Sequence, residues 1–156
     1  MMSFRITGLA PDPFLALFGL PDEELVAHGA KRYRVDGTPG YPDRIEMRDA
    51  EPGESLLLLN YTHQPAASPY RSSHAIFVRE GATRAYDEVG VVPRVLRTRP
   101  LSLRAFDDSG MMVDADLIDG ERAEQLIEKL FADPRAAYIH AHYARRGCYA
   151  GRIDRA

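Results

Sequence analysis

Two histidines stand two residues apart in a short apolar segment near the C-terminus, residues 138–143 (YIHAHY). Side chains alternate in direction along an extended strand, so Tyr138, His140 and His142 share one face of this segment. Two neighbouring imidazoles can bind a first-row transition ion such as zinc, or exchange protons near neutral pH. His140 and His142 are therefore the candidate catalytic residues.

A second polar cluster, residues 60–73, is rich in groups that bind ligands. Arg71 can form paired hydrogen bonds to a carboxylate or phosphate, and Ser72 and Ser73 add hydroxyl donors. Where this cluster meets the strand at 138–143, we expect a pocket for a small anionic metabolite, with a histidine as acid or base. The candidate ligand-binding residues are Asn60, Tyr61, His63, Arg71, Ser72, Ser73 and Arg104.

A metal site is the second interpretation of the paired histidines. His140 and His142 would supply two ligands, because a catalytic zinc site uses three protein ligands and keeps one position open. The third ligand would be His63, Asp114 or Asp116. Hydrolytic chemistry would follow from such a site, although the sequence assigns no cofactor.

The same residues also have structural interpretations. Arg71 can tie down its own loop, and Ser72 and Ser73 can cap a turn. His140 and His142 can be half-buried polar residues that hydrogen-bond to a neighbour such as Tyr138.

The only cysteine, Cys148, follows two arginines at 145–146. Nearby positive charge lowers the pKa of a thiol, so Cys148 is a candidate nucleophile with His142 as its base. At the start of a strand, however, a cysteine usually packs as a small apolar residue. The eight tyrosines favour a different class, a non-catalytic interaction module or homodimer.

Composition limits the class of protein. With 156 residues, we expect one domain spanning residues 1–156. The net charge of −3 argues against a nucleic-acid partner, and no segment approaches the roughly 18 apolar residues of a membrane span. The N-terminus has no signal-peptide pattern and one cysteine excludes a disulfide framework, so the expected location is the cytoplasm.

Arginine outnumbers lysine 18 to 2, which fits either anion recognition or a GC-rich genome.

Hydrophobic periodicity predicts an α+β fold with a mostly antiparallel sheet. Short N-terminal helices are expected around residues 14–18 and 20–29, and one long late helix after Asp119, which is placed to cap it. The predicted strands cover residues 4–7, 31–36, 44–48, 56–61, 74–79, 101–107, 111–117, 137–143 and 148–153. Residues 56–61 are apolar on both faces, which indicates an interior strand.

The strands at 101–107 and 111–117 are predicted to form a hairpin around a three-residue loop at 108–110. This register pairs Leu101 with Leu117 and Leu103 with Ala115 on one face. On the other face it sets Arg104 against Asp114, which gives this carboxylate a salt-bridge partner.

Several sequence blocks together resemble the bacterial family known as domain of unknown function 1203. They are LLLNYTHQP (57–65), SPYRSS (68–73), IFVRE (76–80), GMMVDAD (110–116) and YIHAH (138–142). The resemblance runs along nearly the whole chain and implies a bacterial protein of one domain. It implies no activity and no catalytic residue.

Overall fold

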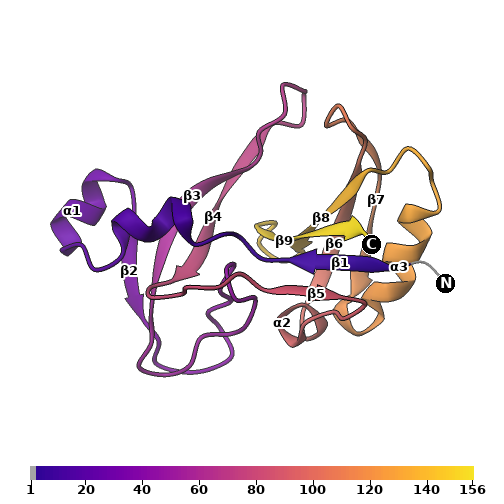
Figure 1. Cartoon of the computed structure of the whole chain (residues 1–156). Coiled ribbons are helices and arrows are strands. Elements are labelled where there is room, and N and C mark those ends of the chain that lie inside the picture. Colours follow the sequence, from indigo (N-terminus) through magenta and orange to yellow (C-terminus); the bar gives the residue numbers. More distant parts are fainter. Residues whose placement is uncertain (1–2) are drawn as a thin grey trace.

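The computed structural model describes residues 3–156 and consists of two antiparallel sheets with few helices (Figure 1). The larger sheet has six strands in the order β5-β1-β9-β8-β6-β7, and the smaller has three in the order β2-β3-β4. The strands are β1 Phe4–Thr7, β2 Lys31–Arg34, β3 Ser55–Gln64, β4 Ser72–Arg79, β5 Asp87–Val89, β6 Pro100–Phe106, β7 Met112–Asp119, β8 Tyr138–Tyr143 and β9 Tyr149–Arg155.

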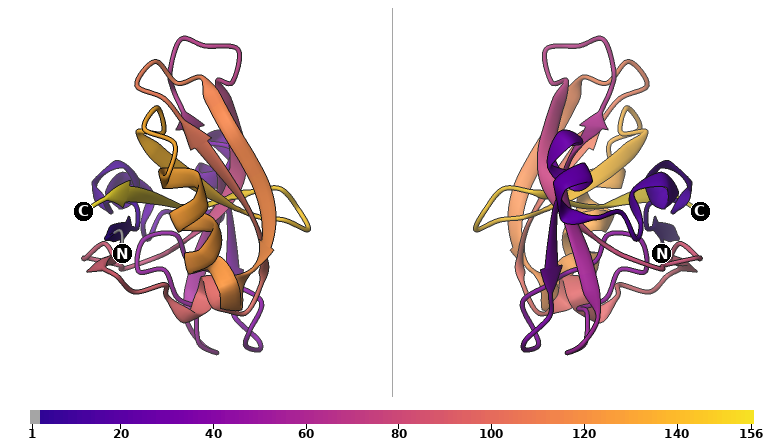
Figure 2. Two further views of the ribbon diagram at one scale, coloured as in Figure 1. Left: turned by 90° about the vertical axis from the view of Figure 1, so that its right-hand side faces the viewer. Right: turned by 90° about the vertical axis from the view of Figure 1, so that its left-hand side faces the viewer.

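The helices cover the sheets from outside. Helix α3, Ala123–Phe131, lies on the side of the larger sheet away from the smaller one (Figures 1 and 2). Its buried positions Leu126, Ile127 and Leu130 follow helical spacing and join one core with residues of β6 and β8. The remaining helical elements are short: η1 Asp12–Leu17, α1 Asp22–Ala27, α2 Arg94–Arg97 and η2 Gly120–Arg122.

The late helix was predicted as one long element, and the structure corrects this. It consists of the three-residue 3-10 turn η2 followed by the nine-residue α3. Asp119 occupies the N-cap position of η2, but its side chain makes no capping hydrogen bond to the described residues. The helix therefore starts on a tighter turn without the expected carboxylate cap.

Strand β8 confirms the predicted alternation of its side chains. It lies inside the larger sheet, between β9 and β6, and is buried almost throughout. Ile139 and Ala141 join the core under α3, so His140 and His142 face the opposite way. The interior position predicted for residues 56–61 is also confirmed, because β3 lies between β2 and β4.

The register predicted for the β6–β7 hairpin is wrong by one residue. Arg104 lies opposite Ala115, and Ala105 lies opposite Asp114. The three-residue loop at 108–110 is confirmed, because the Asp107 N–H donates to the Met111 carbonyl and Phe106 lies opposite Met112. An irregularity after Ala105 adds one residue to β7 and shifts all later partners.

The same shift removes the two other pairs that the sequence predicted. Leu101 lies opposite Ile118 instead of Leu117, and Leu103 lies opposite Asp116 instead of Ala115. Arg104 and Asp114 form no salt bridge. Arg104 therefore keeps its positive charge on the face it shares with His140, its partner across β6 and β8.

The strand predicted at residues 44–48 is also absent. Ile45 and Met47 are buried, as the alternating pattern suggested, but they join different cores. Met47 has a φ of 52°, a left-handed conformation that no extended strand contains. The Asp43 carboxylate accepts hydrogen bonds from the backbone N–H groups of Glu46 and Arg79, and this fixes the segment as a compact loop.

Candidate metal centre

Four of the five histidines of the chain meet where the two sheets approach each other. His63 comes from β3 and His74 from β4, while His140 and His142 come from β8. His63, His140 and His142 are buried, with exposed fractions of 7%, 3% and 0%. One ring nitrogen from each of these three lies within 4.8 Å of the other two.

Each of the three buried histidines has a ring nitrogen without a hydrogen-bond partner among residues 3–156. These atoms are His63 Nδ1, His140 Nδ1 and His142 Nε2. Buried polar atoms nearly always have a partner, because an unsatisfied one costs about 1–3 kcal/mol. Three such atoms on neighbouring side chains indicate a group of atoms arranged to bind something else.

The hydrogen bond of His142 identifies which of its nitrogens is free to accept. Its Nδ1 lies 2.9 Å from the carbonyl oxygen of Gly147. A carbonyl oxygen can only accept, so Nδ1 carries the proton. In the neutral ring, Nε2 then keeps its lone pair, and Nε2 is the unpartnered atom.

His63 is held in a comparable way by residues of β4. Its Nε2 lies 2.6 Å from Nδ1 of His74 and 3.3 Å from the Ser72 hydroxyl oxygen. When Nε2–H donates to His74, Nδ1 of His63 keeps its lone pair. The ring of Tyr149 stacks on His63 with a 5.1 Å centroid separation, which fixes the plane of the imidazole.

Burial keeps the three histidines neutral. It lowers the pKa of His63 to about 4 and the pKa values of His140 and His142 to about 3. The cause is the cost of placing a charged imidazolium away from water. At neutral pH the cluster therefore presents three lone pairs and no positive charge of its own.

Arg104 supplies a positive charge beside this neutral cluster. Its charge contributes to lowering the pKa values of all four clustered histidines. Arg104 donates to the Ser102 hydroxyl at 3.2 Å and forms no salt bridge with a described carboxylate. Burial lowers the pKa of Arg104 itself. An anion that entered here would meet a half-buried cation without a competing acidic partner.

The structure brings some of the predicted ligand-binding residues to the cluster and leaves others outside. His63 belongs to the cluster. The Ser72 hydroxyl oxygen lies 3.3 Å from Nε2 of His63, and the charge of Arg104 lowers the pKa values of the clustered histidines. Tyr61 lies nearby, with its ring 6.1 Å from that of Tyr149, and burial raises the pKa of Tyr61. Asn60, Arg71 and Ser73 are exposed, and Arg71 donates to the Pro65 carbonyl within its own loop.

The predicted carboxylates and the predicted thiol nucleophile are not part of the cluster formed by His63, His140 and His142. Asp114 and Asp116 are exposed, and Asp116 faces Lys129 of α3 at 3.9 Å. The thiol of Cys148 accepts a hydrogen bond from Arg44 at 3.1 Å, and not from the arginines that precede it in the sequence. His142 uses its Nδ1 for Gly147 and does not serve this thiol.

Two residues that complete the cluster, His74 and Tyr149, were not predicted. A sequence signal for His74 existed, because the strands predicted at 56–61 and 74–79 form a hairpin that sets Tyr61 opposite His74. No comparable signal existed for Tyr149. It reaches His63 only because β9 and β3, from different sheets, approach each other.

Comparison with known proteins identifies the family. Residues 40–155 match the model of the family described as "Protein of unknown function (DUF1203)", so the chain belongs to this family, as its sequence blocks predicted. No curated protein and no solved structure matches the chain. Within residues 3–156, no helix has the length and apolar character needed to cross a membrane.

Proposed function

We propose that this protein binds a transition-metal ion of the zinc class through His63, His140 and His142. Two observations carry the proposal. One ring nitrogen from each histidine lies within 4.8 Å of the other two, and each ring has one buried nitrogen without a partner among the described residues. Imidazole nitrogens suit zinc, copper, iron and nickel, whereas magnesium and calcium prefer oxygen ligands.

The spacing of the nitrogens is compatible with one ion. Tetrahedral ligands at about 2.0–2.1 Å from zinc lie roughly 3.3 Å from one another. The three nitrogens lie within 4.8 Å of one another, so binding requires a contraction of at most about 1.5 Å. Three protein ligands leave a fourth position open, which is the arrangement of catalytic rather than structural zinc sites.

The outer contacts of the cluster also favour a metal site. Histidine ligands commonly donate their second N–H to a fixed acceptor, which sets the tautomer and the ring orientation. His142 has such an acceptor in the Gly147 carbonyl, and His63 has one in His74 when Nε2 of His63 carries the proton. A purely structural histidine would not need its remaining nitrogen to stay free.

The chemistry that we propose is hydrolysis of a small anionic substrate. A bound ion of this class activates water and polarises a carbonyl or phosphoryl oxygen. Arg104 stands beside His140 without a carboxylate partner and would hold the negative charge of the substrate. We place this activity in the bacterial cytoplasm, which suits a chain with one cysteine.

Zinc binding tests the proposal directly. Calorimetric titration of zinc into chelator-treated protein is expected to give one site per chain. His63→Ala, His140→Ala and His142→Ala should each weaken zinc binding by at least about 100-fold, because each removes a ligand. His28→Ala is the matched control, because His28 is the fifth histidine and is exposed. Equal zinc affinity in all four variants would refute the site.

Hydrolysis is tested separately with the zinc-loaded protein. Release of nitrophenol from 4-nitrophenyl phosphate and 4-nitrophenyl acetate should require His140 and His142. Arg104→Gln should reduce turnover of the phosphate ester more than that of the neutral acetate ester, since only the former carries a charge for Arg104 to hold. Equal losses for both esters would remove Arg104 from the proposed role.

A further inference from the structure

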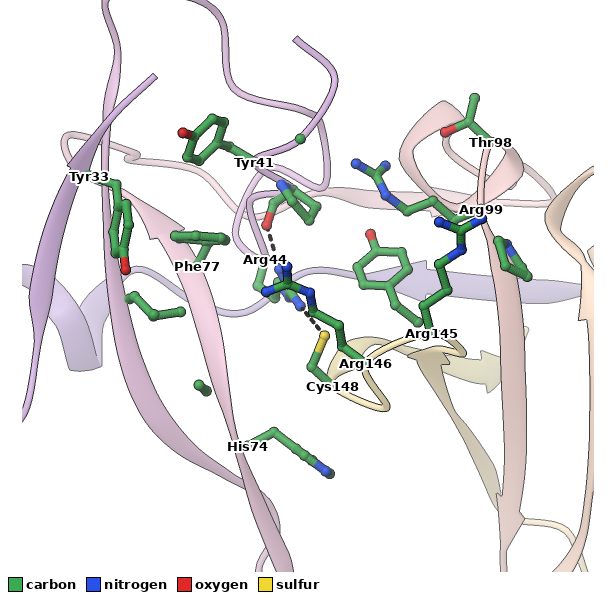
Figure 3. Close-up of a pocket in the computed structure, with 16 residues that line it drawn as sticks. Tyr33, Tyr41, Arg44, His74, Phe77, Thr98, Arg99, Arg145, Arg146 and Cys148 are labelled. Atoms are coloured by element: carbon green, nitrogen blue, oxygen red, sulfur yellow. Dashed lines mark hydrogen bonds between the residues drawn. The ribbon is translucent and has the colours of Figure 1, made fainter. Parts of the chain in front are cut away.

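A cavity of about 1020 Å³ lies between the two sheets, close to the histidine cluster but with a different chemical character. It extends from Tyr33 of β2 and Phe77 of β4 to the loop after β8, which contains Arg145, Arg146 and Cys148 (Figure 3). His74 lines the cavity and also contacts His63, so the two regions adjoin. The volume is that of a small-molecule site.

Four arginines and no acidic residue line this cavity. The arginines are Arg44, Arg99, Arg145 and Arg146. This is unexpected in a chain with 23 acidic and 20 basic residues and a net charge of −3. Concentrated positive charge in a concave site favours an anionic ligand.

Arg44 is a buried cation whose bonds all go to neutral groups. It is 2% exposed and donates to the carbonyl oxygens of Pro42 and Tyr149 at 2.6 and 2.9 Å, and to the Cys148 sulfur. It has no carboxylate partner among residues 3–156. Buried charges are normally paired, because removing an ion from water costs several kcal/mol. A ligand with negative charge would supply the missing partner.

Two more arginines are free to contact a ligand. Arg145 and Arg146 are exposed in the loop between β8 and β9, and neither forms a hydrogen bond or ion pair with a described residue. Arg99 differs, because Asp49 neutralises it at 2.6 Å. The guanidinium carbons of Arg44 and Arg99 lie 5.1 and 5.2 Å from the ring centroid of Tyr143. These cation–π contacts hold the two side chains on this side of the cavity.

The opposite side of the cavity is aromatic. Figure 3 shows Tyr33, Tyr41 and Phe77 across from Arg99, Arg145 and Arg146. The ring of Phe77 contacts those of Tyr33 and Tyr41 at centroid separations of 5.4 and 5.6 Å. Aromatic rings of this kind bind flat apolar groups by stacking or edge contacts.

We infer that this cavity binds a small molecule that combines an aromatic ring with a carboxylate or phosphate group. The ring lies against Tyr33, Tyr41 and Phe77, and the anionic group points toward Arg145, Arg146 and the buried Arg44. The concave shape and the volume favour a small molecule over a protein surface, which would need a larger and flatter contact. The inference does not depend on a bound metal.

Four naphthalene and phosphate probes test this inference in chelator-treated protein. The probes are 2-naphthoate, 2-naphthylphosphonate, 2-naphthol and inorganic phosphate. The first two combine ring and charge and distinguish a carboxylate from a phosphate preference, whereas 2-naphthol lacks the charge and inorganic phosphate lacks the ring. The chain has no tryptophan, so naphthalene emission is measured without tryptophan emission.

The ringed anions should bind at least about tenfold more tightly than either incomplete probe. Arg145→Gln combined with Arg146→Gln should weaken both ringed anions at least about tenfold and leave 2-naphthol unchanged. The control is Arg84→Gln combined with Arg122→Gln, which removes the same charge from exposed positions outside the cavity. The inference is wrong if no ringed anion binds, if 2-naphthol binds as tightly, or if the two double variants behave alike. None of these binding measurements uses zinc, so their result can be interpreted even if the metal proposal fails.

Discussion

Two neighbouring regions of the molecule favour ligands of opposite charge. They are the histidine cluster (His63, His140 and His142) and the arginine cavity (lined by Arg44, Arg99, Arg145 and Arg146), and His74 contacts both. The cluster buries neutral side chains whose free lone pairs attract a cation. The cavity gathers four guanidinium groups without an acidic residue and attracts an anion. Both lie between the two sheets, where neither sheet alone could supply all the residues. The comparison shows that one junction offers neutral imidazoles on one side and guanidinium groups on the other, of which only Arg99 has an acidic partner among the described residues.

The largest expected effect is a pH dependence of the unfolding free energy. It should come from the neutral histidines of the cluster and not from the arginines of the cavity, which stay charged. The lowered pKa values of His63, His140 and His142 mean that the unfolded chain binds more protons below pH 6.5. The contribution of these histidines to the unfolding free energy is therefore complete above pH 6.5 and is lost as the pH falls toward 4 for His63 and toward 3 for His140 and His142. From pH 7.5 to pH 5, each histidine should cost about 2 kcal/mol of unfolding free energy.

Urea unfolding of the metal-free protein at several pH values measures this dependence. His140→Gln should flatten the profile by the share of one histidine, because glutamine does not titrate. His28→Ala should leave the profile unchanged, since His28 is exposed. A flat wild-type profile would contradict the burial of neutral histidines.

The second prediction is a substitution that alters the cavity but not the metal ligands. Arg44→Met keeps most of the side-chain volume but leaves the carbonyls of Pro42 and Tyr149 without their donor. Loss of these buried bonds should lower the unfolding free energy by about 1–3 kcal/mol, because removal of the buried charge and its desolvation cost offsets part of the loss. Zinc affinity should change by less than about twofold. A large loss of zinc affinity in the folded variant would show that the two regions are one site.

The smallest effect tests the residue shared by both regions. His74→Ala removes the acceptor that fixes the tautomer of His63. Zinc affinity should fall by about 10- to 100-fold, as expected for an outer contact, and less than in His63→Ala. Calorimetric titration beside His28→Ala measures the difference. Unchanged affinity would remove His74 from the support of the metal ligands.

The sequence predicted the elements more reliably than their pairing. The alternation in residues 138–143 was sufficient to place His140 and His142 on one face, because the strand period is fixed by backbone geometry. The loop of the β6–β7 hairpin was predicted correctly, but the register beyond it depended on one extra residue in β7, which does not change the hydrophobic pattern. The left-handed backbone of Met47 was likewise hidden in an alternating sequence.

The site was only partly predictable for a similar reason. His63 was a candidate because of its type, but its proximity to His140 depends on how β3 approaches β8 across the two sheets. The arginine cavity gave no local signal. Arg44, Arg99 and Arg145 are widely separated in sequence and come together only through tertiary packing. Sequence patterns describe single elements, whereas both regions are made between elements.

X-ray absorption spectroscopy of the zinc-loaded protein tests the central claim most directly, because it identifies the ligand atoms. The account predicts three imidazole nitrogens at about 2.0–2.1 Å and no sulfur, with the fourth position filled by an oxygen or other light atom. The signal should lose one imidazole in His63→Ala. A sulfur ligand at about 2.3 Å, which only Cys148 or a methionine could supply, or fewer than three imidazoles in the wild type, would contradict the three-histidine centre.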